Sequence, residues 1–295
     1  MIHLLALLGI VVISFSAIFV GLAGVSPVSA TFFRMAYALP PLFVLWWWAR
    51  SRADRSAFRA WLAFLSGIVL SVDLSMWHWS ISLIGAGLST VLANVQVVFV
   101  GAFAWMLFKE RPTGRAIAVL PFVFLGVVLI SGLGRPDAYG SDPVLGAFLG
   151  TAAGASYGAF LLLFRSSNRG LVHPSGPLFY ATLGAVVGTL VVALFDPGFH
   201  VRFTWPAHGW LLALALLPQV LGWLLIATAL PRLPALETSV LLLLQPMLTV
   251  IWGVIIFAES LSPVQVTGVL LVLGGIALVT FSGGAVRQTR APSEP

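Results

Sequence analysis

The sequence contains no cysteine and very few charged residues. Only 8% of its 295 residues are Asp, Glu, Lys or Arg, where soluble proteins contain about 25%. Without cysteine the chain forms no disulfide, thiolate metal site or cysteine nucleophile. With so little charge a soluble globule of this length could not cover its surface with polar groups. This excludes a soluble enzyme, a nucleic-acid-binding domain and a disordered chain.

Motifs typical of metal-dependent and aspartyl membrane enzymes are also missing. The sequence has no H-E-x-x-H run, whose two histidines would bind zinc on one helix face, and no pair of aspartates inside an apolar run. We therefore expect neither enzyme activity nor a metal or other cofactor.

Long apolar runs dominate what is present: 60% of the residues are hydrophobic and the mean hydropathy is +1.05. A transmembrane helix needs about 20 apolar residues, and ten such runs follow one another with only short gaps. They are Leu4–Ala23, Val28–Trp48, Trp61–Leu83, Leu88–Phe108, Ala116–Leu133, Val144–Phe164, Pro177–Phe195, Trp210–Leu230, Leu236–Ala258 and Val264–Phe281. Their length and lack of polar alternation favour helices over barrel strands. The sequence thus predicts an all-α membrane protein with ten transmembrane helices.

The basic residues are distributed unequally between alternate gaps. With a cytoplasmic N-terminus, only Arg135 and Arg202 lie in outer gaps. The inner gaps and tail hold Arg50, Arg52, Arg55, Arg59, Lys109, Arg111, Arg115, Arg165, Arg169, Arg232, Arg287 and Arg290. This asymmetry is what the positive-inside rule requires. We expect a multi-pass protein of the cytoplasmic (inner) membrane with both termini in the cytoplasm.

The second half of the chain repeats the first at a constant spacing. Gln96 and Glu110 recur 149 positions later as Gln245 and Glu259. Three more pairs share the spacing: Leu92 with Leu241, Phe108 with Phe257, and Gly126 with Gly275. Because each copy would contain five spans, an odd number, the second copy must be inverted in the membrane. Inverted repeats are typical of alternating-access transporters, whose substrate site lies near the bilayer midplane.

The repeat also sets the expected domain organisation. Residues 1–133 form the first five-helix repeat, residues 134–283 form the second, and residues 284–295 form a polar tail. The two repeats are expected to enclose a central cavity.

At this point the sequence resembles the drug/metabolite transporter superfamily, EamA type. The resemblance rests on the order of several features rather than on one motif. These are Arg34 in the second run, the Lys109-Glu110-Arg111-Pro112 turn, Pro246 in the ninth run, and Glu259-x-Leu261-x-x-x-Gln265-x-x-Gly268 followed by Gly274-Gly275. The chain departs from the pattern at Val97, where the repeat counterpart of Pro246 would be a proline. The resemblance implies export of amino acids or other small metabolites, and the aromatic-rich runs point to the aromatic amino-acid exporter branch.

Two ionisable residues lie inside the predicted spans, where each is costly and therefore a candidate for function. Asp73 is about 18 Å into the third helix and Arg34 about 9 Å into the second from the opposite face, at 1.5 Å per residue. Asp73 is interpreted as a proton-titrating group, an anchor for a substrate ammonium, or a structural partner of Arg34. Arg34 itself is assigned a structural role.

Three glutamines are further candidates for the substrate site. Gln96 and Gln245 both fall at the expected midplane, and Gln219 lies inside the eighth run. An amide offers donors and an acceptor to a zwitterion. The alternative is that each forms an interhelical hydrogen bond, as polar residues in membrane bundles commonly do.

Aromatic residues and prolines complete the candidate set. Trp77 shares a helix face with Asp73, and Trp77, Tyr157 and Trp223 offer rings that stack on a substrate or attract an ammonium group. Membrane-interface positions are the alternative for Trp77. His78 is a candidate binding residue or a histidine satisfied within the bundle. The prolines are predicted hinges, because each frees the carbonyl four residues earlier, and they are Pro218 and Pro246.

The sequence therefore predicts a carrier that exports small metabolites, most of all amino acids, by alternating access. Its expected partners are a small-molecule substrate and the lipid bilayer, with no nucleic acid, and its expected state is a monomer or weak homodimer. The alternatives are a nucleotide-sugar or other organic-anion carrier of the same fold, a channel, or a membrane enzyme. Dianionic substrates would require several interior basic residues, and the spans supply Arg34.

Overall fold

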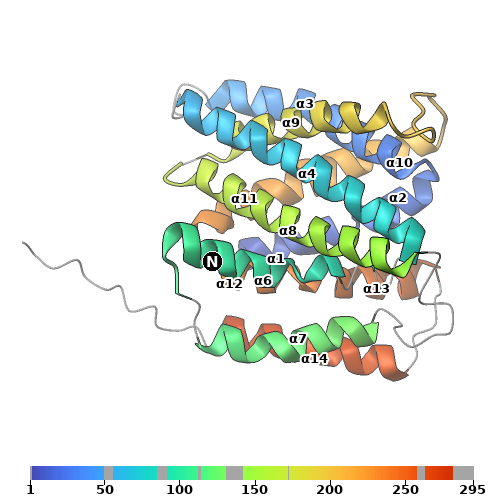
Figure 1. Cartoon of the computed structure of the whole chain (residues 1–295). Coiled ribbons are helices and arrows are strands. Elements are labelled where there is room, and N and C mark those ends of the chain that lie inside the picture. Colours follow the sequence, from blue (N-terminus) through green and yellow to red (C-terminus); the bar gives the residue numbers. More distant parts are fainter. Residues whose placement is uncertain are drawn as a thin grey trace, which may run out of the picture.

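The computed structural model describes residues 2–49, 56–84, 89, 92–111, 114–130, 142–171, 173–257 and 263–281. Within these ranges the regular structure is entirely helical (Figure 1). The elements are α1 (Ile2–Ser14), α2 (Ser16–Ala23), α3 (Pro27–Ala49), α4 (Ala57–Ile84), α6 (Gln96–Phe108), α7 (Gly114–Ile130), α8 (Pro143–Asn168), α9 (Ser175–Ala193), α10 (Ala207–Leu214), the π-helix η1 (Ala215–Gly222), α11 (Trp223–Ala229), the 3-10 helix η2 (Leu230–Arg232), α12 (Ala235–Leu242), α13 (Leu244–Phe257) and α14 (Pro263–Phe281). The predicted all-α class is confirmed.

Within the described ranges, six helical segments are long and apolar enough to cross a membrane, so the chain is a multi-pass membrane protein. They are Ile2–Ala23, Pro27–Ala49, Ala57–Ser80, Val144–Asn168, Ser175–Ala193 and Ala207–Arg232. Shorter apolar helices cover Leu92–Phe108, Ile117–Gly126 and Thr238–Thr249. The tenth predicted run coincides with α14. The count of ten spans remains a prediction.

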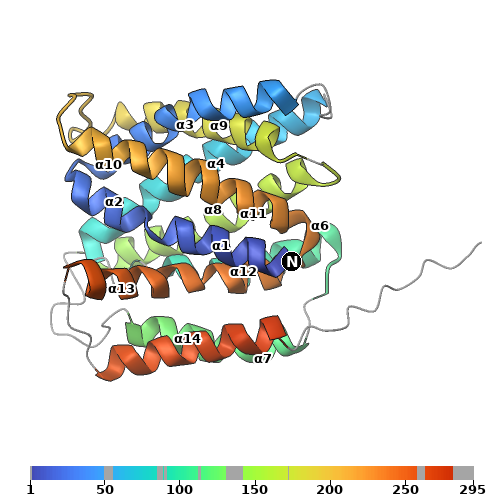
Figure 2. The ribbon, with the colours of Figure 1, turned by 180° about the vertical axis from the view of Figure 1, so that it is seen from behind.

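The helices lie side by side with their long axes along one common direction (Figures 1 and 2). α4 packs on α8 and α9, and α3 packs on α9. On the other side of the bundle α1 packs on η1 and α11, while α6 packs on α8. α7 and α14 pair closely with each other along one edge of the molecule and contact α12 and α13 less.

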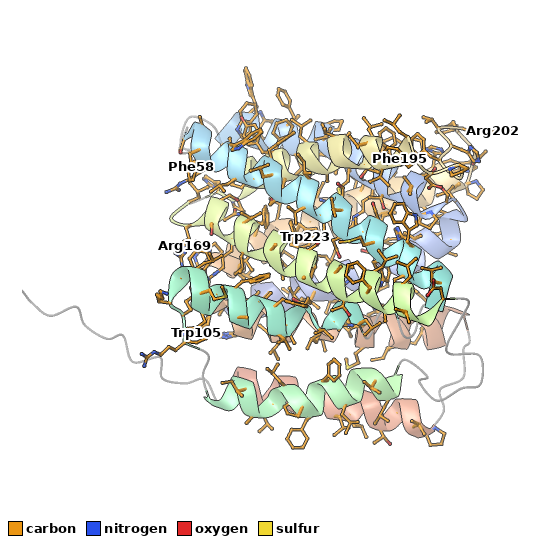
Figure 3. The ribbon with its side chains drawn as sticks, viewed as in Figure 1. Phe58, Trp105, Arg169, Phe195, Arg202 and Trp223 are labelled. Carbon is orange, nitrogen blue, oxygen red and sulfur yellow. The ribbon has the colours of Figure 1, made fainter. Side chains whose placement is uncertain are left out.

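The periphery of the bundle is apolar. Figure 3 shows Phe58, Trp105 and Phe195 projecting outward, and all three side chains are highly exposed, whereas Trp223 lies between the helices and is buried. Arg169 and Arg202 lie at opposite ends of the bundle. A belt of exposed large hydrophobic side chains is stable only against lipid, which supplies the apolar environment that water cannot.

Small residues bring α4 and α9 into backbone contact. A Cβ atom added to Gly67 would lie 1.8 Å from the carbonyl oxygen of Ala181, and one added to Gly184 would lie 2.0 Å from that of Phe64. Lipid tails are as apolar as the side chains, so helices in membranes associate through close packing of this kind. The α4–α9 seam therefore fixes the position of α4, which carries Asp73.

Three apolar runs are interrupted inside the bundle. α1 and α2 are separated at Phe15, α12 and α13 at Leu243, and α6 begins after a turn at Val95. Pro246 lies in the first turn of α13, where its missing N–H leaves the Leu242 carbonyl without a helical partner. The ninth run is therefore two helices, with Pro246 just after the break.

The break in the first run is held by α13. The Thr249 hydroxyl donates to the Ser14 carbonyl oxygen at 3.0 Å, and Trp252 Nε1 donates to Ser14 Oγ at 2.8 Å. The Trp252 ring also stacks on Phe15, with 4.5 Å between centroids. Backbone groups freed inside a membrane protein must be satisfied by protein or water, and Thr249 of α13 satisfies the Ser14 carbonyl oxygen.

Candidate functional site: a buried charged site between α3, α4 and α8

The Asp73 carboxyl group is buried in α4. Its side chain is 7% exposed, and it forms no hydrogen bond or ion pair with any residue that the structure describes. Burying an unpaired charged or polar group costs several kcal/mol. A carboxyl in this position is therefore a candidate for binding a ligand or a proton.

Arg34 is held by a chain of side-chain hydrogen bonds. Its Nε donates to Gln219 Oε1 at 2.9 Å, and Gln219 Nε2 donates to Thr182 Oγ1 at 3.2 Å. These contacts join α3 to η1 and η1 to α9. The structural ion pair between Arg34 and Asp73, an alternative raised by the sequence, is not formed in the described part of the chain.

Tyr157 is a third titratable residue in the interior of the bundle. It comes from α8 and is within electrostatic range of both Asp73 and Arg34. Arg34 and Tyr157 lie deep in the protein and yet remain partly accessible to solvent.

The aromatic end of the site is formed by α4. Trp77 follows Asp73 by one helical turn on the same face, and its Nε1 is buried with no hydrogen-bond partner among the residues placed. The His78 ring lies 5.2 Å from the Trp77 ring, and His78 is within electrostatic range of Asp196, just beyond the end of α9. An unused donor beside an unpaired carboxylate is typical of a site that a ligand completes.

The other predicted site residues are engaged elsewhere or stand apart. Gln96 is 3% exposed and its Oε1 accepts from Ser239 Oγ at 2.9 Å, which ties α6 to α12. The buried Trp223 ring meets Phe160 and Phe164 edge-on at 5.2 and 5.8 Å. Gln245 lies half-buried in the first turn of α13.

Pro218 shapes the segment that carries Gln219. The ring of Pro218 removes one helical N–H, and the eight residues of η1 adopt the wider π-helical turn. Gln219 follows directly and is 2% exposed. The distortion thus places a buried amide where Arg34 and Thr182 reach it.

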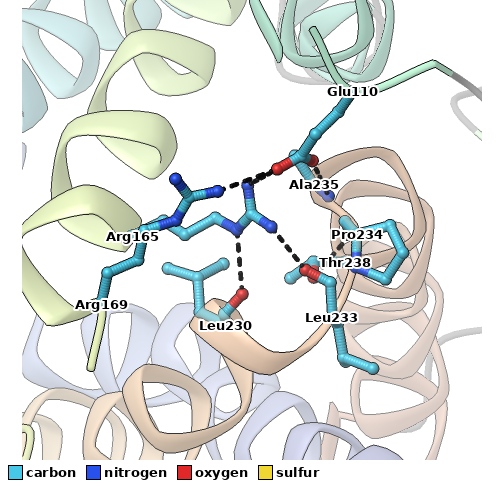
Figure 4. Close-up of polar contacts among 8 residues, drawn as sticks. All are labelled: Glu110, Arg165, Arg169, Leu230, Leu233, Pro234, Ala235 and Thr238. Carbon is cyan, nitrogen blue, oxygen red and sulfur yellow. Dashed lines mark hydrogen bonds and ion pairs between the residues drawn. The ribbon is translucent and has the colours of Figure 1, made fainter. Parts of the chain in front are cut away.

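A second polar cluster lies at one end of the bundle, and Arg169 is one of its members (Figures 3 and 4). Glu110 Oε1 accepts from Arg165 Nη1 at 2.6 Å and from Arg169 Nη2 at 3.1 Å, and Glu110 Oε2 accepts from the Ala235 N–H at 3.3 Å. We name Glu110, Arg165, Arg169 and the Ala235 N–H the Glu110 cluster.

Arg165 extends the Glu110 cluster toward the start of α12. Its side chain is 6% exposed, and it donates to the carbonyl oxygens of Leu230 and Leu233 at 3.2 and 2.9 Å. Sequence reasoning placed Glu110 in a turn and Arg165 among the loop cations but did not connect them. The four-residue turn around Glu110 was visible in the sequence. Its ion-pair partner was not, because Arg165 lies 55 residues further along the chain.

One short pattern invites comparison with hydrolases. Gly154-Ala155-Ser156-Tyr157-Gly158 fits G-x-S-x-G, which in α/β-hydrolases places the serine on a sharp strand-to-helix turn. Here the run lies inside the continuous helix α8. The backbone thus lacks the turn that exposes such a serine. In the residues placed by the structure, no three His, Cys, Asp or Glu side chains gather as a metal site.

Comparison with known proteins shows that the chain is similar to membrane transporters. A model of the EamA-like transporter family matches residues 1–132 and 144–281. An uncharacterised transporter of Archaeoglobus fulgidus is 26% identical over 286 residues, which cover 94% of this chain and 96% of the relative. The uncharacterised transporter sll1319 of Synechocystis is 28% identical over 75% of this chain and 67% of its own length.

Two further similarities are to a relative whose substrate is stated and, separately, to a solved structure. The threonine/homoserine exporter RhtA of Escherichia coli K12 is 27% identical over 231 residues, covering 77% of this chain and 72% of the exporter. A solved crystal structure superposes with a TM-score of 0.78 over 95% of this chain and 96% of that one, at 18% identity. At this identity the likeness shows a shared fold.

Proposed function

Because the chain belongs to the EamA-like transporter family, we propose that it exports small metabolites, amino acids above all, by alternating access across the cytoplasmic membrane. The resemblance drawn from the sequence is confirmed at the level of the family. The buried Asp73 carboxyl group, which has no hydrogen-bond or ion-pair partner among the described residues, carries the proposal. It supplies a polar binding position inside a bundle whose outer surface faces lipid.

Two inverted five-helix repeats, residues 1–133 and 134–283, are part of the proposal. The family model matches one stretch in each half. A pseudo-twofold axis would relate the α4–α8 contact to that of α1 with η1 and α11, and the α6–α8 contact to that of α1 with α13, and each of these pairs is packed. The breaks before Gln96 and Gln245 also correspond. Residues 284–295 lie outside the described part of the chain.

The substrate class is inferred from the site and from one relative. Asp73 and Arg34 place opposite charges in the same interior, which suits a molecule with both charges and disfavours the dianion that a nucleotide-sugar carrier would bind. RhtA is a threonine/homoserine exporter, which supports amino acids. Aromatic side chains of the substrate would meet Trp77 and Tyr157. A channel would differ by showing flux that does not saturate.

The direct test is counterflow in proteoliposomes. Vesicles containing purified protein are loaded with one unlabelled amino acid, diluted into the same labelled amino acid, and compared with protein-free vesicles. We expect transient, saturable accumulation of label for at least one amino acid. Accumulation for none, across a panel that includes threonine and phenylalanine, would contradict the proposal.

The orientation and the inversion are tested by cysteine labelling, for which the cysteine-free chain is a ready background. Single variants Thr113→Cys, Ser262→Cys and Arg202→Cys are treated in intact cells with a membrane-impermeant maleimide. We expect labelling at positions 262 and 202, and at position 113 only after the membrane is opened. Labelling of 113 and 262 from the same side would overturn the inverted arrangement.

A further inference from the structure

We propose that the Glu110 cluster is a cytoplasmic gate with no ion-paired counterpart at the outer end, so that the carrier without substrate rests closed to the cytoplasm and open to the outside. This inference rests on the proposed carrier function and on its inverted repeats. It adds which of the two alternating states is the more stable one.

The Glu110 cluster joins the two proposed repeats to each other. Glu110 follows α6 in the first repeat. Its partners Arg165, Arg169 and the Ala235 N–H all belong to the second repeat. A further contact joins the repeats at the same place, because Arg59 Nη1 of α4 donates to the Arg169 carbonyl oxygen at 2.7 Å. A movement that separates the repeats at this end must break these contacts.

Arg165 is the member of the Glu110 cluster that most needs a counter-charge. Its side chain is 6% exposed, whereas that of Arg169 is 48% exposed. Its other two hydrogen bonds go to neutral groups, the carbonyl oxygens of Leu230 and Leu233. A buried charge that loses its only counter-charge is strongly destabilised, so the Glu110 carboxylate favours the closed arrangement.

The protein beneath the Glu110 cluster is shielded from solvent. Thr238, one helical turn after Ala235 in α12, lies beside the cluster and is 3% exposed (Figure 4). The Arg169 guanidinium covers Phe108, with 4.9 Å between its central carbon and the ring centroid. This end of the bundle is therefore closed in the structure, and Thr238 reports on its opening.

The sequence repeat does not supply the same ion pairs at the opposite end. Glu110 recurs 149 positions later as Glu259, but the positions 149 residues before the two arginines of the Glu110 cluster are Ser16 and Val20. The two states of an inverted-repeat carrier differ in which end is closed. The state closed to the cytoplasm thus gains an ion-paired contact that the repeat does not provide for the other state, and the equilibrium shifts toward it.

Maleimide labelling of a buried cysteine measures how often this end opens. Thr238→Cys is introduced into the cysteine-free chain, and its labelling rate is measured without substrate in lipid nanodiscs, where both faces are accessible. We expect slow labelling, and labelling about tenfold faster with Glu110→Gln, because a charge-assisted hydrogen bond of the closed state is lost. Arg169→Gln should give a smaller increase, since its contact is half exposed. An unchanged rate with Glu110→Gln would overturn the gate.

A matched cysteine distinguishes opening of one end from unfolding. Thr189→Cys lies toward the opposite end of α9 and is also 3% exposed, and the replaced hydroxyl has no hydrogen-bond partner among the residues placed. Its rate should not rise with Glu110→Gln. If both cysteines react faster, that variant is unfolded, and Arg169→Gln decides by the same comparison: no selective increase at position 238 would overturn the gate. Arg232→Gln removes an exposed charge outside the cluster and should leave both rates unchanged.

The repeat counterpart tests whether the gate is one-sided. Glu259, which lies outside the described residues, is replaced in Glu259→Gln, and the Thr238→Cys rate should stay the same. If Glu259 held the outer end closed, its loss would open that end, and the cysteine at position 238 would react more slowly. A slower reaction would therefore overturn the inferred resting state.

The outcomes separate the gate from the carrier proposal. Counterflow by the wild-type protein without a selective increase at position 238 would overturn the gate alone. No counterflow of any labelled amino acid in the wild-type protein would overturn the carrier proposal and the gate together.

Discussion

Arg165 and Glu110 form an ion pair with 2.6 Å between Nη1 and Oε1. The two residues belong to α8 and to the turn after α6, and Arg165 also binds the carbonyl oxygens that precede α12. One ion pair thus ties three segments together at a single end of the bundle (Figure 4). In the alternating-access carrier proposed above, we expect this contact to hold one face closed.

We expect Glu110→Gln to weaken this closure. The substitution leaves the guanidinium of Arg165 buried without a counter-charge, so the free energy of unfolding should fall by about 1–3 kcal/mol. The measurement is thermal unfolding of the purified protein in detergent. Arg232→Gln is the control, because Arg232 is exposed and its Nη1 donates to the Thr228 carbonyl oxygen of the same chain segment. An unchanged melting temperature for Glu110→Gln would show that the pair contributes little.

We expect substitutions in the α4–α9 seam to be strongly destabilising. Gly67→Ala and Gly184→Ala would each place a methyl group about 2 Å from a backbone carbonyl oxygen, so the helices must separate, at a cost of about 1–3 kcal/mol or more. Gly274→Ala in α14 is the matched control, since nothing lies within 4 Å of its added Cβ. The control should be neutral or slightly stabilising. Equal melting temperatures for all three variants would contradict the close packing.

We expect Pro246→Ala to slow exchange without destabilising the fold. Alanine restores the N–H that bonds to the Leu242 carbonyl, which favours a continuous helix through the break at Leu243. If the break is a hinge, the initial counterflow rate should fall several-fold while the melting temperature holds or rises. Pro121→Ala in α7 serves as a proline control away from the site. A wild-type rate for Pro246→Ala would remove the hinge role.

We expect Gln219→Leu to impair substrate binding more than Thr182→Val. The leucine leaves Arg34 Nε unpaired, whereas the valine removes only the outer hydrogen bond of the chain. Loss of one buried partner costs about 1–3 kcal/mol, so the concentration for half-maximal exchange should rise about fivefold or more for Gln219→Leu and less for Thr182→Val. The reverse order would show that Gln219 does not position Arg34.

Local signals in the sequence correctly predicted the all-α membrane class. Run length and hydropathy predicted the helices, and the order of motifs around Glu110 and Pro246 led to the family that the comparisons confirm. The interruption at Pro246 was also visible in advance. The matching turn at Val95 was not, because Val97 supplies no proline signal at that position.

The partners of the site residues were less predictable. Sequence reasoning offered Asp73 as a partner of Arg34, and the structure gives Gln219 instead, 185 positions away. It treated Gln96 and Gln245 as equivalent, yet Gln96 binds Ser239 while Gln245 lies half-buried at the start of α13. Small differences in the rotation of a helix decide which of several polar groups a side chain reaches.

By itself the sequence determined that the chain is a membrane protein made of apolar helices. The reason is that the transfer of a run of about 20 residues into lipid depends only on the residues of that run. It also fixed which polar residues are carried inside. Only the tertiary structure decided that Arg34 is held by Gln219, that Asp73 has no partner among the described residues, and that Arg165 pairs with Glu110. Those pairings depend on how distant helices pack and rotate against one another, and no local stretch of sequence contains that information.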